Sequence, residues 1–341
     1  MPVVPVVAYT DPAWAVGPEG AVDAARADIE RGVYGAEIEM RFGPYREGAF
    51  DVGGKEFLRF LEGADAVAVY RARITEEAVD VLKPTCRVVA RQGVGVDNLD
   101  VELLAENGIL AFNVPDYCVD EVSSHTAAML LALERGLVVQ DGLVKGGKWN
   151  IHGGGVPPRL ADLAVGVVGF GRIGRASARK LQPFYGQVLA YDPYVHADLM
   201  RGYGVHWRPS LAALLADAHA VLLHAPLDDS TRNMLNRDSL RALAPGALLV
   251  NTARGALVEP EAVLERLRDG RLGGYAADVF TPEDPCEHPV NREILTFPNT
   301  LVSSHRAFLS DASEHSQRLR LAQEIRRVLV SGEPPLFGRL A

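Results

Sequence analysis

Three glycines at a fixed spacing constrain the middle of the chain. Gly169, Gly171 and Gly174 form a Gly-x-Gly-x-x-Gly sequence that directly follows the apolar run 164–168. Helix-forming residues follow, and Asp192 stands at the end of the next apolar run, 187–191. A glycine turn between a strand and a helix, with an acid after the next strand, is typical of a dinucleotide-binding unit. The alternative is a glycine-rich turn that binds no ligand.

Each part of this pattern has a physical reason. The first glycine permits a tight turn, the second lets the backbone approach a pyrophosphate, and the third lets the helix pack closely on the strand. The helix start at Arg172 and Ile173 offers N–H groups and a positive dipole end to the phosphates. The Asp192 carboxylate accepts hydrogen bonds from ribose hydroxyls and repels a 2′-phosphate. We therefore expect NAD, rather than NADP, as the cofactor.

Apolar runs alternate with helix-like segments along most of the chain. This alternation predicts an α/β protein with two Rossmann-like domains, doubly wound parallel sheets and a cleft between the domains. The predicted helices in the first part are 75–83 and 101–107. The predicted strands are 3–9, 66–70, 87–91 and 109–113, and later 164–169, 187–191, 220–224, 247–251, 274–278 and 300–303.

Two further helices bear on the domain organisation. Segment 119–146 is apolar almost all round, so we predict one long helix buried between elements or between subunits. At the C-terminus, Asp311 and Glu314 fit a capping box. The apolar residues of that helix fall on one face, so we expect it to pack back on the first domain; they are Leu319, Ala322, Ile325 and Leu329. The predicted domains are 1–112 plus 306–341, which makes the first domain discontinuous, and 113–305.

The charge balance excludes several classes of function. Lys and Arg number 35 against 44 Asp and Glu, a net charge of −9. Binding to nucleic acid or to an anionic membrane needs a basic face, so we expect neither partner. The cysteines are few and far apart, and no His or Cys cluster suggests a metal. Because no leader or membrane-spanning run is visible, we expect a cytoplasmic protein.

Polar residues follow three of the later predicted strands. Arg254 lies in an Asn-Thr-Ala-Arg-Gly sequence after one strand, Asp278 ends the next with Glu283 close behind, and His305 follows the last. The carboxyl ends of parallel strands share one edge of a sheet, which is where such sheets bind ligands. An arginine, an acid and a histidine are thus expected at one site.

At this point the sequence resembles the D-isomer-specific 2-hydroxyacid dehydrogenase family over nearly its whole length. Within that family, segments 113–118 and 305–308 look most like the branch that includes the C-terminal binding proteins. The segments that carry the family resemblance are 93–98 (Gly-Val-Gly-Val-Asp-Asn), 169–174, 224–227 (His-Ala-Pro-Leu), 251–255 and 277–280 (Ala-Asp-Val-Phe).

The resemblance implies a catalytic role for three residues. Arg254 would bind the substrate carboxylate and polarise its carbonyl through a fixed fork of donors. His305 would give a proton to the carbonyl oxygen in reduction and take it back in oxidation. Glu283 would hydrogen-bond the histidine and favour its charged form.

The resemblance also implies binding roles. It makes the first domain the substrate-binding, flavodoxin-like one. The backbone N–H groups of Val94 and Gly95 would hold the substrate carboxylate, and Arg91 and Arg71 would face the substrate. The residues implied to line the cofactor are Thr126, His224, Ala225, Pro226, Thr231, Thr252, Ala253 and Asp278.

The chain departs from the family pattern around the histidine. Ser304 stands where the family usually has proline, which puts the rigidity of the loop in doubt. Arg306 replaces a small or apolar residue. Phe308 replaces a tryptophan of the C-terminal binding proteins and predicts a pocket for a sizeable or apolar side chain.

Some assignments have competitors. Asp284 competes with Glu283, although the family spacing favours Glu283. Of the other histidines, His224, His288 and His315 are interpreted as cofactor-wall, loop and helix-surface residues. The arginines at 71, 73, 91 and 306 either make the site basic, for a substrate with a second anion, or are solvated surface residues.

The sequence therefore predicts an NAD-dependent oxidoreductase that interconverts a 2-oxo acid and a D-2-hydroxy acid. The alternative is an NAD(H)-sensing binding module with little or no turnover, as in the C-terminal binding proteins. Helix 119–146 is predicted to form a homodimer interface.

Overall fold

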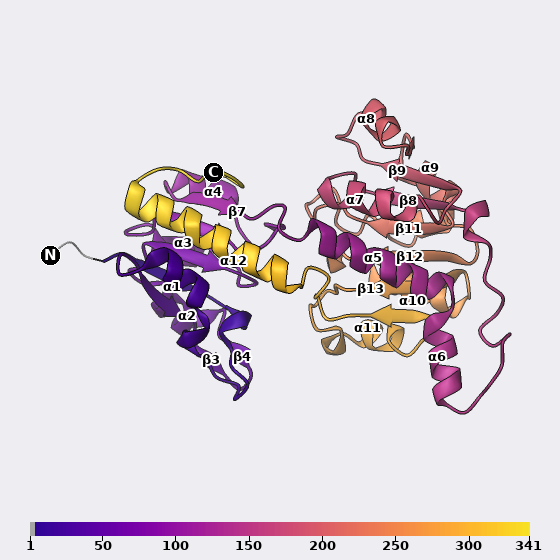
Figure 1. The fold of residues 1–341 in the computed structure, drawn as a ribbon, viewed down its shortest axis with the longest axis horizontal. Helices are drawn as coiled ribbons and strands as arrows, with labels where there is room; N and C mark the ends of the chain where they lie inside the picture. Colours follow the sequence, from indigo (N-terminus) through magenta and orange to yellow (C-terminus); the bar gives the residue numbers. More distant parts are fainter. Residues whose placement is uncertain (1–3) are drawn as a thin grey trace. The chain divides into compact units, whose positions relative to one another are not determined.

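The computed structural model describes residues 4–341, which divide into two compact units (Figure 1). The first unit comprises the described residues up to Tyr117 together with Ser310–Ala341, and the second comprises Cys118–Leu309. The sequence prediction placed the two boundaries between the units a few residues earlier along the chain, at 112–113 and 305–306. The C-terminal segment thus packs in the unit that contains the start of the chain.

The first unit is built on a parallel sheet with strand order β2-β1-β5-β6-β7. This is the flavodoxin-like order, in which successive strands are added on either side of the first. The strands are β1 (Val6–Tyr9), β2 (Glu39–Phe42), β5 (Ala66–Val69), β6 (Val88–Arg91) and β7 (Leu110–Asn113). Val3, where the first strand was predicted to begin, lies outside the described residues. The sequence missed β2, whose residues are only partly buried.

Helices cover both faces of this sheet. One core lies under α1 (Asp28–Tyr34) and α12 (Asp311–Arg326). The core on the other face lies under α2 (Gly54–Leu61), α3 (Glu76–Leu82) and α4 (Val101–Glu106). A small antiparallel hairpin, β3 (Tyr45–Arg46) and β4 (Ala49–Phe50), lies outside the sheet and was not predicted.

The N-cap of helix α12 lies one residue before the predicted cap, Asp311. Ser310, not Asp311, is the N-cap, and it forms a capping box with Ser313. Asp311 lies in the first turn, where its charge suits the helix dipole. The predicted face is broader than expected, since Leu321 and Val328 are buried on it along with Ala322.

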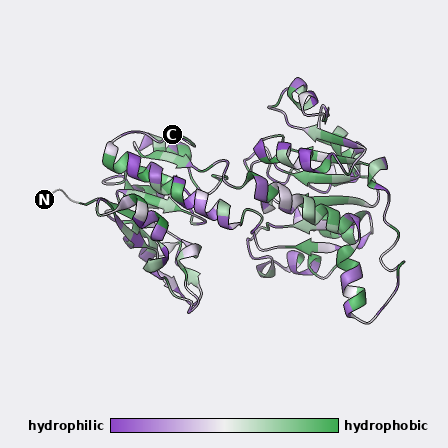
Figure 2. Ribbon diagram, viewed as in Figure 1, coloured by the Kyte–Doolittle hydropathy of each residue, from purple (hydrophilic) through white to green (hydrophobic). Residues whose placement is uncertain are grey.

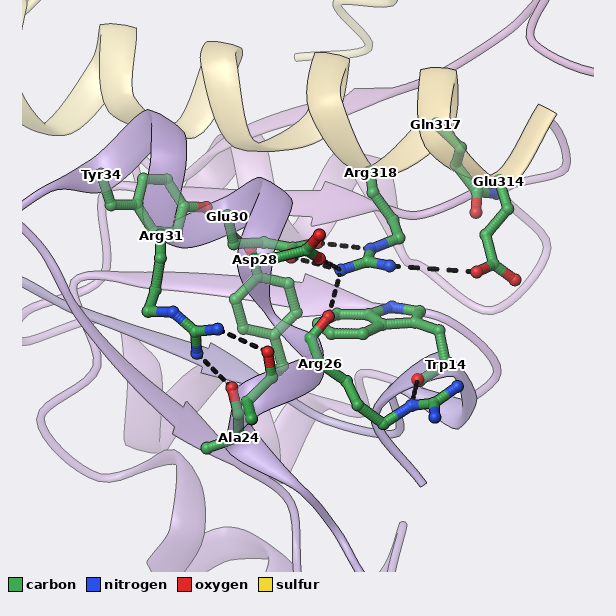
Figure 3. Close-up of polar contacts among 12 residues, drawn as sticks. Trp14, Ala24, Arg26, Asp28, Glu30, Arg31, Tyr34, Glu314, Gln317 and Arg318 are labelled. Atoms are coloured by element: carbon green, nitrogen blue, oxygen red, sulfur yellow. Dashed lines mark hydrogen bonds and ion pairs between the residues drawn. The ribbon is translucent and has the colours of Figure 1, made fainter. Parts of the chain in front are cut away.

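A buried ion pair fixes α12 against α1 (Figure 3). Nε of Arg318 donates to Glu30 Oε1 at 2.9 Å and its Nη2 donates to Oε2 at 2.7 Å. The Glu30 side chain is 1% exposed and that of Arg318 is 8% exposed. The guanidinium carbon also lies 3.9 Å from the centre of the Trp14 ring, so the charge has both an ionic and an aromatic partner.

The second unit is built on a parallel sheet with strand order β10-β9-β8-β11-β12-β13-β14. The order reverses between β8 and β11, which is the switch point where such sheets bind dinucleotides. The strands are β8 (Ala164–Val168), β9 (Gln187–Tyr191), β10 (His206–Trp207), β11 (Ala220–Leu223), β12 (Ala247–Asn251), β13 (Leu272–Ala277) and β14 (Thr300–Val302). The sequence missed β10, which is two exposed residues long.

Helices of the second unit also form two layers. One core includes α7 (Arg172–Leu181) and α8 (Ala197–Gly202), with part of α5 (Val119–Glu134). The other includes α9 (Leu211–Asp217), α10 (Pro260–Arg268) and α11 (Pro289–Ile294). In Figure 2 the strands are mainly hydrophobic, while the helices carry hydrophilic residues as well.

The predicted helix 119–146 is wrong as a single helix. It is two helices, α5 (Val119–Glu134) and α6 (Leu137–Lys145), separated at Gly136. Gly136 has φ +60°, a left-handed conformation that ends a helix readily in glycine. Helix α5 packs on α7, whereas none of the residues of α6 is buried within the chain.

Within residues 4–341, no helix combines the length and hydropathy that a bilayer span needs. The same described residues contain no group of three or more His, Cys, Asp or Glu placed to hold a metal ion.

Candidate active site

The glycine turn lies between β8 and α7. Gly169 has φ +90°, and a Cβ there would come within 2.6 Å of the His224 carbonyl carbon. A Cβ on Gly174 would come within 2.1 Å of the Gly169 carbonyl oxygen. Position 174 therefore requires glycine for the helix to pack this closely on the turn. A Cβ on Gly171 would meet nothing within 4 Å. Two glycines thus build the turn, and the third faces open space.

Among the described residues, the start of α7 has no side-chain cap. Gly171 is the N-cap, and no side chain accepts a hydrogen bond there. Asp192, after β9, accepts from the Phe170 N–H at 2.7 Å and from the Tyr194 N–H at 2.9 Å. A carboxylate has about four acceptor positions, so Asp192 retains capacity for hydroxyl donors.

His224 directly follows β11, beside the glycine turn. Its Nε2 is buried and has no hydrogen-bond partner among residues 4–341. Burial lowers the pKa of His224 to about 4, so the imidazole is neutral at pH 7. Nearby, the Thr231 hydroxyl donates to the Pro226 carbonyl at 2.8 Å, which closes the turn after Ala225. A neutral, unpartnered ring nitrogen at this edge suits a polar ligand.

Helix α5 meets the end of β12 through two hydroxyls. Thr126 Oγ1 lies 2.7 Å from Thr252 Oγ1, and both side chains are buried. The sequence assigned both residues to the cofactor pocket, and the structure brings them together at this strand end.

The backbone around Arg254 is fixed by the buried Asn251. Its Nδ2 donates to the Arg254 carbonyl at 2.8 Å, and its Oδ1 accepts from the Ala253 N–H at 3.1 Å. The Arg254 Nη1 donates to the Ala253 carbonyl at 2.8 Å. A Cβ on Gly255 would come within 2.2 Å of the Phe280 carbonyl carbon, so this position requires glycine. The arginine is thus held on a rigid turn.

Hydrogen bonds join the ends of three neighbouring strands. The Asp278 N–H donates to the Asn251 carbonyl at 3.0 Å, and the His305 N–H donates to the Asp278 carbonyl at 2.7 Å. Strands β12, β13 and β14 are adjacent and parallel. The segments that carry Arg254, Asp278 and His305 therefore lie side by side at one edge of the sheet.

His305 pairs with a carboxylate. Its Nδ1 lies 2.5 Å from Glu283 Oε1, and its side chain is 25% exposed. Asp284, the competitor, instead caps a short turn by accepting from the Cys286 N–H at 2.8 Å. With Nδ1 engaged by Glu283, Nε2 is the imidazole nitrogen that can exchange a proton with a substrate.

The remaining residues that the sequence analysis named near His305, and the two other histidines, differ in exposure and in location. Ser304 and Arg306 are exposed, and Phe308 is partly buried. His288 is the N-cap residue before α11 and lies in the connecting loop, as predicted. His315 is an exposed residue of α12, in the first unit.

In the first unit, arginines lie at the carboxyl ends of the strands. Arg91 ends β6 and is buried, whereas Arg71, after β5, is exposed. Their guanidinium carbons lie 5.9 and 5.3 Å from the centre of the Tyr70 ring. Burial raises the pKa of Tyr70, so the phenol is neutral at pH 7. These side chains form one cationic, aromatic edge.

Asp11 shapes this edge and was not predicted. It is 6% exposed, and its carboxylate accepts from the N–H groups of Tyr70, Arg71 and Ala72 at 3.1, 2.6 and 3.2 Å. Val94 and Gly95 follow β6 in the same unit, and the Val94 carbonyl accepts from Asn113 Nδ2 at 2.6 Å. An acid two residues after the first strand was the only available signal.

The sequence also missed two residues beside His305. His125, on α5, lies 2.9 Å from Ser303 Oγ, and Ser303 in turn contacts Asp278. His125 and Ser303 are 178 positions apart, so no local pattern connects them.

Comparisons with known proteins agree with this architecture. The profile of the D-isomer specific 2-hydroxyacid dehydrogenase NAD binding domain matches residues 127–307. D-3-phosphoglycerate dehydrogenase of Methanocaldococcus jannaschii is 30% identical over 295 residues, which cover 86% of this chain. The match spans about half of that relative, 53% of its length. Glyoxylate reductase of Pyrococcus furiosus is 32% identical over 286 residues, or 82% of this chain and 83% of that protein.

A solved structure shows the same fold. D-lactate dehydrogenase from Aquifex aeolicus, complexed with NAD and lactic acid, aligns over 96% of each chain with a TM-score of 0.83 and 24% sequence identity. The chain therefore belongs to the D-isomer specific 2-hydroxyacid dehydrogenase family, a family of NAD-dependent oxidoreductases. Its second unit carries the NAD-binding domain of that family.

The residues present fit NAD. The open space beside Gly171, the uncapped start of α7 and the unpartnered His224 nitrogen lie at the switch point of the sheet. Asp192 supplies an acceptor for ribose hydroxyls.

Proposed function

We propose that this protein interconverts a 2-oxo acid and a D-2-hydroxy acid, with Arg254, Glu283 and His305 as its catalytic residues. The observation that carries the proposal is the 2.5 Å contact between His305 Nδ1 and Glu283, on a segment hydrogen-bonded to the strand end next to Arg254. A pure binding module has no chemical need for this set.

Each residue has a defined task. Arg254 binds the substrate carboxylate through its planar fork of donors and polarises the adjacent carbonyl. His305 Nε2 gives a proton to the carbonyl oxygen during reduction and accepts it during oxidation. Glu283 orients the imidazole through its contact with Nδ1. NAD, when bound, supplies or accepts the hydride.

The second unit would hold NAD with residues from several strand ends. The glycine turn and the start of α7, including Arg172 and Ile173, take the pyrophosphate, and Asp192 takes the adenosine ribose. The remaining proposed contacts are Thr126, His224, Ala225, Pro226, Thr231, Thr252, Ala253 and Asp278.

The first unit would bind the rest of the substrate. The N–H groups of Val94 and Gly95 would hold its carboxylate. Phe308, which belongs to the second unit, would limit its side chain. We further propose that Arg71 and Arg91 bind a second anion, because both are cationic, share Tyr70 and lie at one sheet edge. The relatives named for glyoxylate and 3-phosphoglycerate differ in such a second charge.

A matched substrate pair tests the second anion. We expect kcat/KM for 2-oxoglutarate to exceed that for 2-oxopentanoate by about tenfold or more, since the two share a chain length and differ by one carboxylate. NADH oxidation at 340 nm measures both. Arg71→Met should remove the preference, whereas a wild-type preference for the monoacid contradicts it.

Absorbance at 340 nm also separates an enzyme from a cofactor-sensing module, with NADH supplied for 2-oxo acids and NAD⁺ for 2-hydroxy acids. We expect turnover with at least one acid of a panel that includes glyoxylate, D-lactate and D-3-phosphoglycerate. Tight NADH binding without turnover on a broad panel of 2-oxo and 2-hydroxy acids contradicts the dehydrogenase and favours the binding module.

We also propose a homodimer formed through 119–146 and the segment after it. Support comes from large apolar side chains that the chain leaves exposed on and after α6, namely Leu137, Val144, Trp149, Ile151 and Val156. A second copy of this chain is the proposed partner that covers them.

A further inference from the structure

The segment that carries His305 is tied to a single buried carboxylate. Asp278 is 1% exposed, and its two oxygens accept from the N–H groups of Arg306 at 3.0 Å and Ala307 at 2.9 Å. Its Oδ1 also accepts from the Ser303 hydroxyl. Asp278 therefore accepts hydrogen bonds from residues on both sides of His305 through its side chain. Its backbone carbonyl accepts from the N–H of His305 itself.

These bonds hold His305 in an unusual conformation. His305 has φ +53°, in the left-handed region that residues other than glycine seldom adopt. Such a conformation persists only where the surroundings determine it. The preceding residue is Ser304, which does not restrict the backbone as a proline does. The hydrogen bonds to Asp278 therefore fix the backbone of His305 and, with it, the position of the imidazole.

A second histidine completes the network from outside the loop. His125, on α5, places Nε2 at 2.9 Å from Ser303 Oγ and at 3.8 Å from Asp278 Oδ1. Asp278 Oδ1 accepts from the Ser303 hydroxyl, which has a single hydrogen, so that hydrogen points to Asp278. Ser303 Oγ is then an acceptor toward His125, and His125 must carry its hydrogen on Nε2. The order of donation is His125 to Ser303 to Asp278.

We infer that His125 is a positioning residue for the proposed acid–base histidine, acting through Ser303 and Asp278. The Nε2–H of His125 orients the Ser303 hydroxyl, and this hydroxyl orients the Asp278 carboxylate. The carboxylate in turn holds the backbone of the segment in which His305 contacts Glu283. This inference rests on the proposed function for its kinetic consequence, but its structural content does not depend on turnover.

The kinetic test compares removal of the donor with its replacement. His125→Leu and Ser303→Ala should each lower kcat by about 10–100-fold, the cost of displacing a catalytic group by a fraction of its working distance. The Kd for NADH should change less than about threefold. His125→Gln keeps an N–H donor of similar reach and should retain kcat within about threefold. The double variant His125→Leu/Ser303→Ala should be no slower than the worse single variant, because both act on one network.

His219 supplies a matched control. It is also a partly buried histidine of the second unit paired with a buried acid, since its Nε2 lies 3.2 Å from Glu134. Its N–H donates to the carbonyl of Ala164, where β8 begins, so it lies at the opposite edge of the sheet. His219→Gln should leave kcat unchanged.

A spectroscopic test needs no turnover. In ¹⁵N-histidine-labelled protein, the ring signals of His305 are assigned by their loss in His305→Gln. They should shift in His125→Leu and in Ser303→Ala, and remain in place in His125→Gln and His219→Gln. Unshifted His305 signals in His125→Leu, or a His125→Gln variant as impaired as His125→Leu, would overturn the inference. Absence of wild-type turnover overturns the proposed function instead, and the ring signals then decide this inference alone.

Discussion

His224 shows how burial fixes the charge of a single side chain. Its pKa is lowered to about 4 because the ring is removed from water without a charged partner. In the unfolded chain the same histidine titrates near 6.5. Between these values the unfolded state binds the proton more readily, so the free energy of unfolding falls as the pH falls from about 6.5 toward 4.

This difference predicts a pH dependence that one substitution removes. From pH 7 to pH 5, the His224 contribution should lower the free energy of unfolding by about 2 kcal/mol. In His224→Gln the loss over the same range should be smaller by about that amount. Urea unfolding at both pH values measures it, and equal losses in the two proteins would show that His224 is accessible to protons when folded.

Asp192 decides between two cofactors by charge. A 2′-phosphate brought against this carboxylate meets like charge, which costs several kcal/mol. Asp192→Ala should therefore narrow the ratio of kcat/KM for NADH over NADPH by about tenfold or more. Asp192→Glu keeps the charge and serves as the control. An unchanged ratio in Asp192→Ala refutes the assignment.

At the scale of elements, one buried charge pair connects the two ends of the first unit. Arg318 of α12 is bidentate to Glu30 of α1, and its guanidinium lies over the Trp14 ring (Figure 3). Breaking such a pair is costly because the remaining charge is left buried without a partner.

The expected cost is measurable by denaturation. Arg318→Met should lower the free energy of unfolding of the first unit by about 3–5 kcal/mol. Lys83→Met, which removes the exposed pair with Asp80, should change it by less than about 1 kcal/mol. A loss in Arg318→Met no larger than in this control would mean that the buried pair does not hold α12 in place.

The sequence predicted most strands because strands buried on both faces are continuous apolar runs. Strand β10 was not predicted, because its two residues, His206 and Trp207, are exposed and form no apolar run. The break between α5 and α6 was not predicted, because apolar residues continue on both sides of Gly136. The cap of α12 was misplaced by one residue, since Ser310 and Asp311 are both good caps and only the backbone distinguishes them.

The candidate site was predictable to a similar degree. Arg254, Glu283 and His305 follow strands, and strand ends share an edge, so short patterns find them. His125 could not be found in this way, because its link to Ser303 spans 178 positions and exists only in the fold. Asp11 was missed for the same reason, since its three N–H partners lie about 60 positions away.

At the scale of the whole molecule, the proposed homodimer makes a direct prediction. Exposed apolar residues on and after α6 should be covered by a second copy, so light scattering at micromolar concentration should give twice the chain mass of 36.8 kDa, about 74 kDa. Trp149→Ser, at a side chain that is 86% exposed, should weaken the dimer. A single-chain mass for the wild type contradicts the proposal.

The proposed mechanism depends most on His305 as the acid–base group. The most direct measurement is kcat of His305→Gln against the wild type with NADH and the best 2-oxo acid, together with the Kd for NADH. We predict that kcat falls by roughly 10²–10⁴-fold while the Kd stays within about threefold. A variant that turns over at the wild-type rate would contradict the role of His305 as the acid–base group.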